Sequence, residues 1–91
     1  MIEVKQLSDE EWLITVQSKT TTEHRVRLTG ADLQEVAAGK TDAKQLLEAS
    51  FRFLLEREPN TSILSSFDLP VISRYFPEYK TEIGKLFRGG I

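Results

Sequence analysis

DAKQLLEASFRFLLEREP, residues 42–59, predicts the clearest helix of this chain, over positions 43 to about 58. Asp42 followed by Gln45 resembles a capping box, in which side chains satisfy the free backbone N–H groups at a helix start. Pro59 ends the predicted helix, because the residue before a proline avoids the helical conformation. The side chains at helical spacing form an apolar stripe that needs a core to face: Leu46, Leu47, Ser50, Phe51, Leu54 and Leu55.

The residues before this helix alternate between apolar and polar side chains, as half-buried β-strands do. Strands are predicted at 2–4, 12–16 and 24–28. Their simplest arrangement is a three-stranded antiparallel meander with one buried and one solvated face. An open edge of the first or third strand could pair with another chain.

A short helix is predicted between the strands and the main helix. Thr29 suits its N-cap, and Asp32 would lie near the positive end of the helix dipole. Gly39 suits its C-terminal end, because glycine readily adopts the left-handed conformation that closes many helices.

Prolines divide the C-terminal third of the chain into short helical segments. Asp68 suits the N-cap and Pro70 the first turn of a helix that ends before Pro77. Pro77 can also begin a last helix, with Lys85 and Arg88 near its C-terminal end, where the helix dipole favours cations. The predicted fold class is α+β, with an N-terminal three-stranded antiparallel meander followed by three to four short helices packed on one face.

The composition is that of a single globular domain over residues 1–91. Of its residues, 40% are hydrophobic and 29% charged, with a formal net charge of −2, so the chain is neither strongly basic nor strongly acidic. It has no cysteine, which excludes disulfides and thiolate zinc sites and favours a reducing cytoplasm. Neither a signal-peptide pattern nor an apolar run of about 20 residues is visible, so we expect a cytoplasmic protein with no membrane span.

No set of side chains predicts catalysis or metal binding. His24, the single histidine, shares a strand face with Val26 and Leu28, which favours a packed or edge histidine over a general base. The acidic group at residues 9–11 fits a solvated turn and lacks the ligand spacing of a calcium loop. Ser50 suits a hydrogen bond to the preceding helical turn. We therefore expect a protein that is not an enzyme, with no cofactor, no metal and no small-molecule ligand.

The second half of the chain carries a set of short sequences that belong together. They are FRFLLEREP at 51–59, SIL at 62–64, FDL at 67–69, VI at 71–72 and RYFPEY at 74–79. This set resembles a group of small uncharacterised bacterial proteins that have a short, variable, strand-rich front and a similar helical back. The resemblance implies a bacterial source and a cytoplasmic location, and it assigns no functional residue.

Aromatic and basic side chains are interleaved after residue 66. Aromatic side chains between basic ones can stack on bases and hold phosphates, but the same pattern suits a helical core. Core packing is the favoured interpretation, and a protein-binding surface and a nucleic-acid surface are the alternatives. The residues of the predicted interaction surface are Phe53, which lies off the main apolar stripe, with Arg57, Arg74, Tyr75, Tyr79 and Lys80.

These observations favour a non-enzymatic protein-interaction module or an accessory, regulatory subunit, with a protein partner or a homodimer. The alternative is a nucleic-acid-binding regulator that uses basic and aromatic residues of the C-terminal helices. An isoelectric point near 5.4 counts against that alternative.

Overall fold

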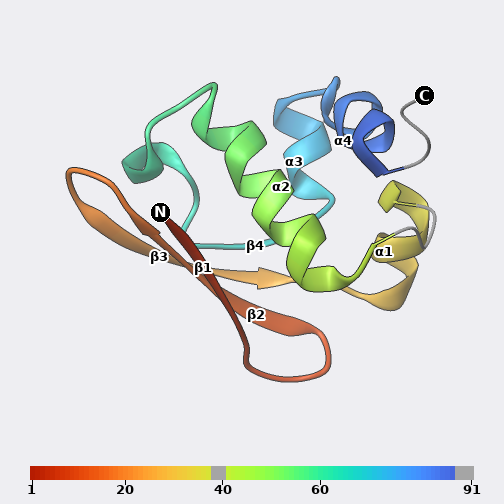
Figure 1. Ribbon diagram of the computed structural model, residues 1–91, viewed down its shortest axis with the longest axis horizontal. Helices are drawn as coiled ribbons and strands as arrows, with labels where there is room; N and C mark the ends of the chain where they lie inside the picture. Colours follow the sequence, from red (N-terminus) through yellow and green to blue (C-terminus); the bar gives the residue numbers. More distant parts are fainter. Residues whose placement is uncertain (38–40, 88–91) are drawn as a thin grey trace.

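In the part of the chain that the structure describes, one sheet of four strands carries four helices on one of its faces, and α2 crosses over the sheet (Figure 1). The computed structural model describes residues 1–37 and 41–87 of the chain. The elements in these ranges are β1 (Ile2–Gln6), β2 (Glu11–Gln17), β3 (Thr21–Arg27), α1 (Gly30–Ala37), α2 (Ala43–Leu55), the 3-10 helix η1 (Asn60–Ser62), β4 (Ser66–Asp68), α3 (Val71–Tyr75) and α4 (Tyr79–Phe87).

The first three strands form the antiparallel meander that the alternating pattern predicts, and the α+β fold class is confirmed. Val4 lies opposite Ile14, which in turn lies opposite His24. β3 begins at Thr21, three residues before its predicted start, because Gln17 and Thr21 already pair across the connecting turn.

The fourth strand, β4, has no counterpart among the predicted elements. It runs parallel to β3, with Phe67 opposite Val26. The backbone N–H of Arg25 donates to the Ser65 carbonyl at 2.8 Å, and that of Leu69 donates to the Arg27 carbonyl at 2.9 Å. β3 is therefore an interior strand, and of the two strands expected as possible open edges, the first and the third, it is β1 that lies at an edge of the sheet.

Two predicted helix starts in the C-terminal third are wrong. Asp68 is not a helix N-cap, because strand pairing with β3 places it in β4. Pro70 takes the N-cap position of α3 and makes no side-chain capping hydrogen bond. The last helix, α4, begins at Tyr79, two residues after Pro77. Lys85 lies in its last turn as predicted, while Arg88 lies outside the described residues.

Both ends of α2 show why it spans the residues it does. The Asp42 carboxylate accepts a 2.8 Å hydrogen bond from the backbone N–H of Gln45, which confirms the predicted cap. At the other end, the N–H groups of Arg57 and Glu58 both donate to the Leu54 carbonyl, so the last turn tightens. The helix ends at Leu55, three residues earlier than predicted, since the chain must leave the helical conformation before the proline that follows.

Helix α1 begins with a reciprocal capping box. The Thr29 hydroxyl accepts from the Asp32 N–H at 3.1 Å, and the Asp32 carboxylate accepts from the Thr29 N–H at 3.0 Å. This pair confirms the predicted helix start. Gly39, the predicted end, lies outside the described residues.

The core lies between the helix-bearing face of the sheet and α2. The sheet contributes Ile14, Val16 and Val26, each at most 1% exposed. Burial of apolar side chains is the main driving force that holds the two layers together. The core also contains Phe67 of β4, and the helices and the segments between the elements contribute Leu28, Val36, Ala37, Leu46, Leu47, Ala49, Phe51, Phe53, Leu54, Ile63, Leu69, Ile72, Tyr79 and Ile83.

A hydrogen-bond network ties η1 and the residues after it to β3. His24 is 2% exposed, and its Nδ1 lies 2.7 Å from the Leu64 carbonyl oxygen. Because a carbonyl only accepts, Nδ1 carries the hydrogen, and Nε2 accepts from the Thr22 hydroxyl at 2.8 Å. The Asn60 amide donates both to that hydroxyl, at 3.0 Å, and to the Thr20 carbonyl, at 2.8 Å. The prediction of a packed histidine is confirmed.

Asn60→Ala should lower the free energy of unfolding by about 1–3 kcal/mol, because it removes two hydrogen bonds made by a buried side chain. Urea unfolding followed by circular dichroism measures the change. The matched control is Thr61→Ala, an exposed neighbour in η1, which should change the free energy by less than about 0.5 kcal/mol. Equal effects of the two substitutions would contradict the network.

Candidate functional site

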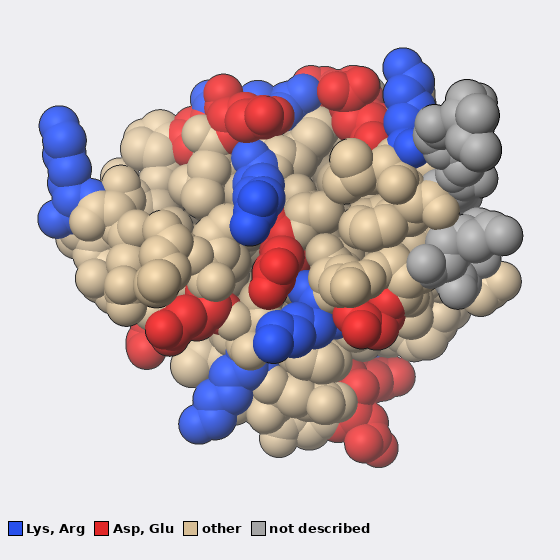
Figure 2. Space-filling view, viewed as in Figure 1, with Lys and Arg blue, Asp and Glu red and all other residues tan. Residues whose placement is uncertain are grey.

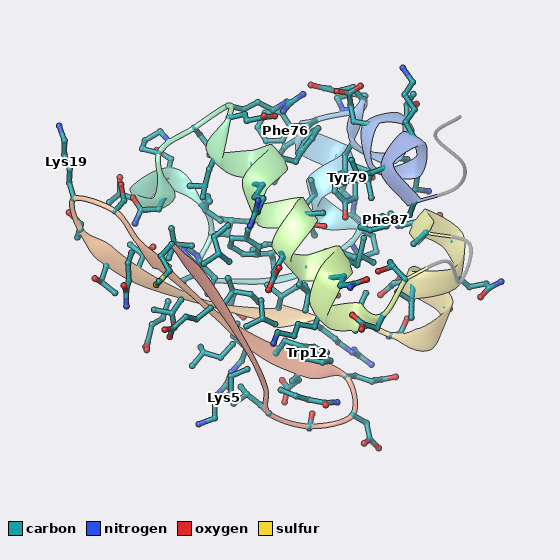
Figure 3. All side chains as sticks on the ribbon, viewed as in Figure 1. Lys5, Trp12, Lys19, Phe76, Tyr79 and Phe87 are labelled. Carbon is teal, nitrogen blue, oxygen red and sulfur yellow. The ribbon has the colours of Figure 1, made fainter. Side chains whose placement is uncertain are left out.

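Two of the six residues in the predicted interaction surface belong to the core. Phe53 is 5% exposed and Tyr79 is fully buried. Their rings meet edge to face, with centroids 5.3 Å apart, and Phe76 packs against Phe53 in the same way at 5.9 Å. The prediction that Phe53 and Tyr79 form a surface is wrong, because α3 and α4 fold back over this side of α2 (Figure 3). Phe53 therefore widens the buried face of α2 beyond its main apolar stripe.

Tyr79 is held by a buried hydrogen-bond chain. The Ser50 hydroxyl donates to the Leu46 carbonyl at 2.7 Å, which confirms the predicted bond to the preceding turn. Because that hydroxyl has used its hydrogen, the Tyr79 hydroxyl donates to the Ser50 oxygen, at 2.6 Å. Burial raises the pKa of Tyr79 to about 12, against the smaller opposing effect of its hydrogen bond with Ser50.

The raised pKa of Tyr79 predicts a loss of stability at high pH. An unfolded tyrosine has a pKa of about 10, so the unfolded chain releases this proton first. The contribution of Tyr79 to the free energy of unfolding is therefore complete below about pH 10 and falls as the pH rises towards 12. In a Tyr75→Phe variant, where Tyr79 is the single tyrosine, tyrosinate absorbance should show a midpoint near 12. A midpoint near 10, equal to that of the urea-unfolded variant, would contradict the burial.

Arg57 links the end of α2 to the start of α4. Its guanidinium lies 3.6 Å from the centre of the Phe53 ring and donates to the Phe53 carbonyl at 3.0 Å. It also forms ion pairs with Glu78 at 3.1 Å and with Glu56 at 3.4 Å. The pKa of Glu78 is lowered, first by its own backbone N–H and then by Arg57. The Arg57 guanidinium is therefore engaged by contacts within the chain.

The other three predicted surface residues are exposed but do not share one role. Lys80 forms an ion pair with Glu35 of α1. Arg74 and Tyr75 lie side by side in the sequence on α3, and Tyr75 is 65% exposed. Figure 2 shows basic and acidic side chains interspersed over one face of the molecule, with no large area of a single sign.

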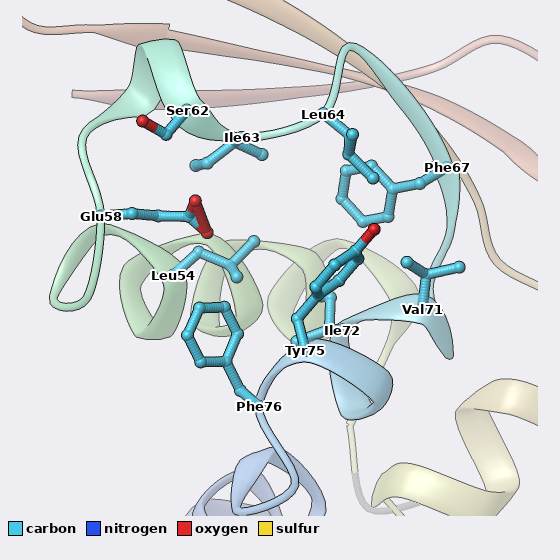
Figure 4. A pocket seen from close by; sticks show the side chains of 10 residues that line it. All are labelled: Leu54, Glu58, Ser62, Ile63, Leu64, Phe67, Val71, Ile72, Tyr75 and Phe76. Carbon is cyan, nitrogen blue, oxygen red and sulfur yellow. The ribbon is translucent and has the colours of Figure 1, made fainter.

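A groove lies beside α3, bounded by the end of α2, the segment 58–64 and β4 (Figure 4). It encloses about 200 Å³. Two large apolar side chains at the groove are open to solvent, Leu64 at 46% and Tyr75 at 65%. The groove is lined by Leu54, Glu58, Ser62, Ile63, Leu64, Phe67, Val71, Ile72, Tyr75 and Phe76.

Glu58 is the single charged residue among those that line this groove. Its side chain is half-buried, and Figure 4 shows the carboxylate directed towards Leu54 and Ile63. Within residues 1–37 and 41–87, no side chain forms a hydrogen bond or ion pair with this carboxylate. The neighbouring Arg57 turns instead to Glu56 and Glu78.

Of the predicted surface residues, Tyr75 alone lines the groove. Sequence reasoning missed Glu58 and Leu64, because their neighbourhood depends on the docking of 60–64 against β3. One feature of the sequence points to Leu64: it is an apolar residue with polar neighbours on its C-terminal side, outside any predicted helix or strand. That pattern does not tell whether such a side chain is buried or exposed.

The described residues contain neither a cluster of potential metal ligands nor a helix that could span a membrane. Across 1–37 and 41–87, no three His, Cys, Asp or Glu side chains lie close enough together to hold a metal ion. In the same ranges, every helix is too short or too polar to cross a bilayer.

Comparison of the chain with protein-family models, with curated proteins and with solved structures finds no match. The resemblance of residues 51–79 to a group of small bacterial proteins therefore stays a prediction. The candidate site consequently depends on the geometry of the chain itself.

Proposed function

We propose that this chain is a non-enzymatic protein-interaction module whose binding site is the groove beside α3. The observation that carries the proposal is the exposure of Leu64 and Tyr75 at the mouth of an apolar hollow. Large apolar side chains exposed together are typical of surfaces that other proteins cover. A cytoplasmic location is part of the proposal and is supported by the lack of cysteine.

The size of the groove supports a peptide side chain as its occupant. Pockets for drug-sized ligands enclose about 300–1,000 Å³, whereas this groove encloses about 200 Å³. A cavity of about 150 Å³ can hold benzene. The groove therefore suits one large apolar side chain, which would act as the anchor of a longer protein segment.

The walls of the groove are fixed before any partner arrives. The His24 ring holds the Leu64 carbonyl, and the Arg25 N–H holds the Ser65 carbonyl. On the opposite side, the backbone N–H of Phe76 donates to the Ile72 carbonyl at 2.8 Å and closes α3. A preorganised site loses less conformational entropy on binding, which supports a role in recognition.

The state of the single histidine supports a non-enzymatic role. Both ring nitrogens of His24 are engaged, one with Leu64 and the other with Thr22. A general base needs a free nitrogen within reach of a substrate. The ring is 2% exposed, so a substrate has no direct approach to it.

Selection from a library of random peptides displayed on phage tests the proposal. We expect the wild-type chain to enrich peptides that carry a large apolar residue. Tyr75→Ser and Leu64→Ser should weaken binding of the selected peptides about tenfold or more, because each removes apolar area at the groove. Leu86→Ser is the matched control, since Leu86 is as exposed as Tyr75, at 65%, but lies on α4, outside the groove.

Two outcomes would contradict the proposal. One is a failure to enrich any peptide, and the other is equal binding by the wild type and both groove variants. Light scattering coupled to size exclusion tests a second copy as the occupant. A wild-type dimer that Tyr75→Ser converts to a monomer would replace the peptide partner with a second copy of this chain.

A further inference from the structure

The Glu58 carboxylate bears on which side chains a peptide bound in the groove would carry. We infer that the groove recognises a peptide segment in which a lysine or arginine lies near the large apolar anchor residue. This inference rests on the proposed function, because it names what the same groove binds. It depends on three properties of Glu58: its position in the groove, its partial burial, and the absence of a partner for its charge among the residues that the structure describes.

The position of Glu58 brings its charge close to the anchor site. Glu58 follows α2 in a turn, and its N–H donates to the Leu54 carbonyl at 2.9 Å. Its carboxylate lies beside Leu54 and Ile63, two apolar residues that line the same groove. A side chain that enters the hollow would therefore lie next to a negative charge (Figure 4).

No residue within 1–37 and 41–87 neutralises this carboxylate. Arg57 is adjacent in the sequence, but its guanidinium packs on the Phe53 ring and pairs with Glu78. Among the residues that line the groove, none is basic. In the part of the chain that the structure describes, Glu58 has no ion pair, so its charge remains available to a ligand.

Covering the groove would remove water from a half-buried carboxylate. An anion that loses its water without gaining a hydrogen-bond donor is strongly disfavoured. A purely apolar or acidic peptide would impose that loss. A lysine or arginine restores the lost interactions, and its long aliphatic stem can lie along the apolar wall while its charged end reaches Glu58.

The test compares two substitutions that remove the same charge. Phage selection is repeated with Glu58→Gln and with Glu56→Gln, and the strongest wild-type peptide is then synthesised and titrated against all three proteins. Glu56 is the matched control, because it lies two residues away and does not line the groove. Circular dichroism of each variant checks that it is folded.

We expect the wild type and Glu56→Gln to enrich peptides with a basic residue near an apolar one. Glu58→Gln should keep the apolar preference and lose the basic one. It should bind the synthetic peptide about tenfold or more weakly, as expected for the loss of a charged hydrogen bond. Added salt should weaken wild-type binding more than Glu58→Gln binding.

The outcomes separate this inference from the proposed function. Wild-type selection of apolar peptides without a basic residue, or an unchanged basic preference in Glu58→Gln, would overturn the inference and leave the proposed function standing. Failure of the wild type to select any peptide would overturn the proposed function, and this inference with it.

Discussion

The hydrogen bond from the His24 ring to the Leu64 carbonyl is the contact on which the groove depends. It joins two residues that are 40 positions apart in the sequence, and it is partly buried. The ring also packs against Phe51 of α2, with centroids 5.3 Å apart. One side chain therefore touches the sheet, the main helix and the connecting segment. Asn60 adds a second link from that segment to β3.

This link explains how so short a chain forms a preorganised site. Once residues 60–64 are held against β3, the residues that follow run alongside β3 and pair with it as the parallel strand β4. α3 then begins at Val71, after two connecting residues, and forms the opposite wall of the groove. Arg57 holds the end of α2 against the start of α4 from the other side. The groove is thus the space left between segments that are each fixed by contacts elsewhere.

Sequence reasoning predicted the elements that local interactions determine. The meander follows from strict alternation, and the starts of α1 and α2 follow from caps whose partners lie three residues apart. The prediction from the sequence failed where contacts between residues far apart in the chain determine the structure. Nothing local distinguishes the three residues of β4 from a turn, because their conformation depends on pairing with β3. Phe53 lies off the main stripe of α2, and its burial depends on how α3 and α4 fold back. The groove was unpredictable for the same reason, since its lining combines α2, β4 and α3.

The most direct test of this account is a nitrogen-15 NMR measurement on the imidazole of His24, the single histidine of the chain. The chemical shifts of the two ring nitrogens report which of them carries the hydrogen. We expect a hydrogen on Nδ1, with a scalar coupling through the hydrogen bond to the Leu64 carbonyl carbon. A hydrogen on Nε2 alone would contradict the account, because Nδ1 could then not donate to Leu64. The wall of the groove would lose the contact that fixes it.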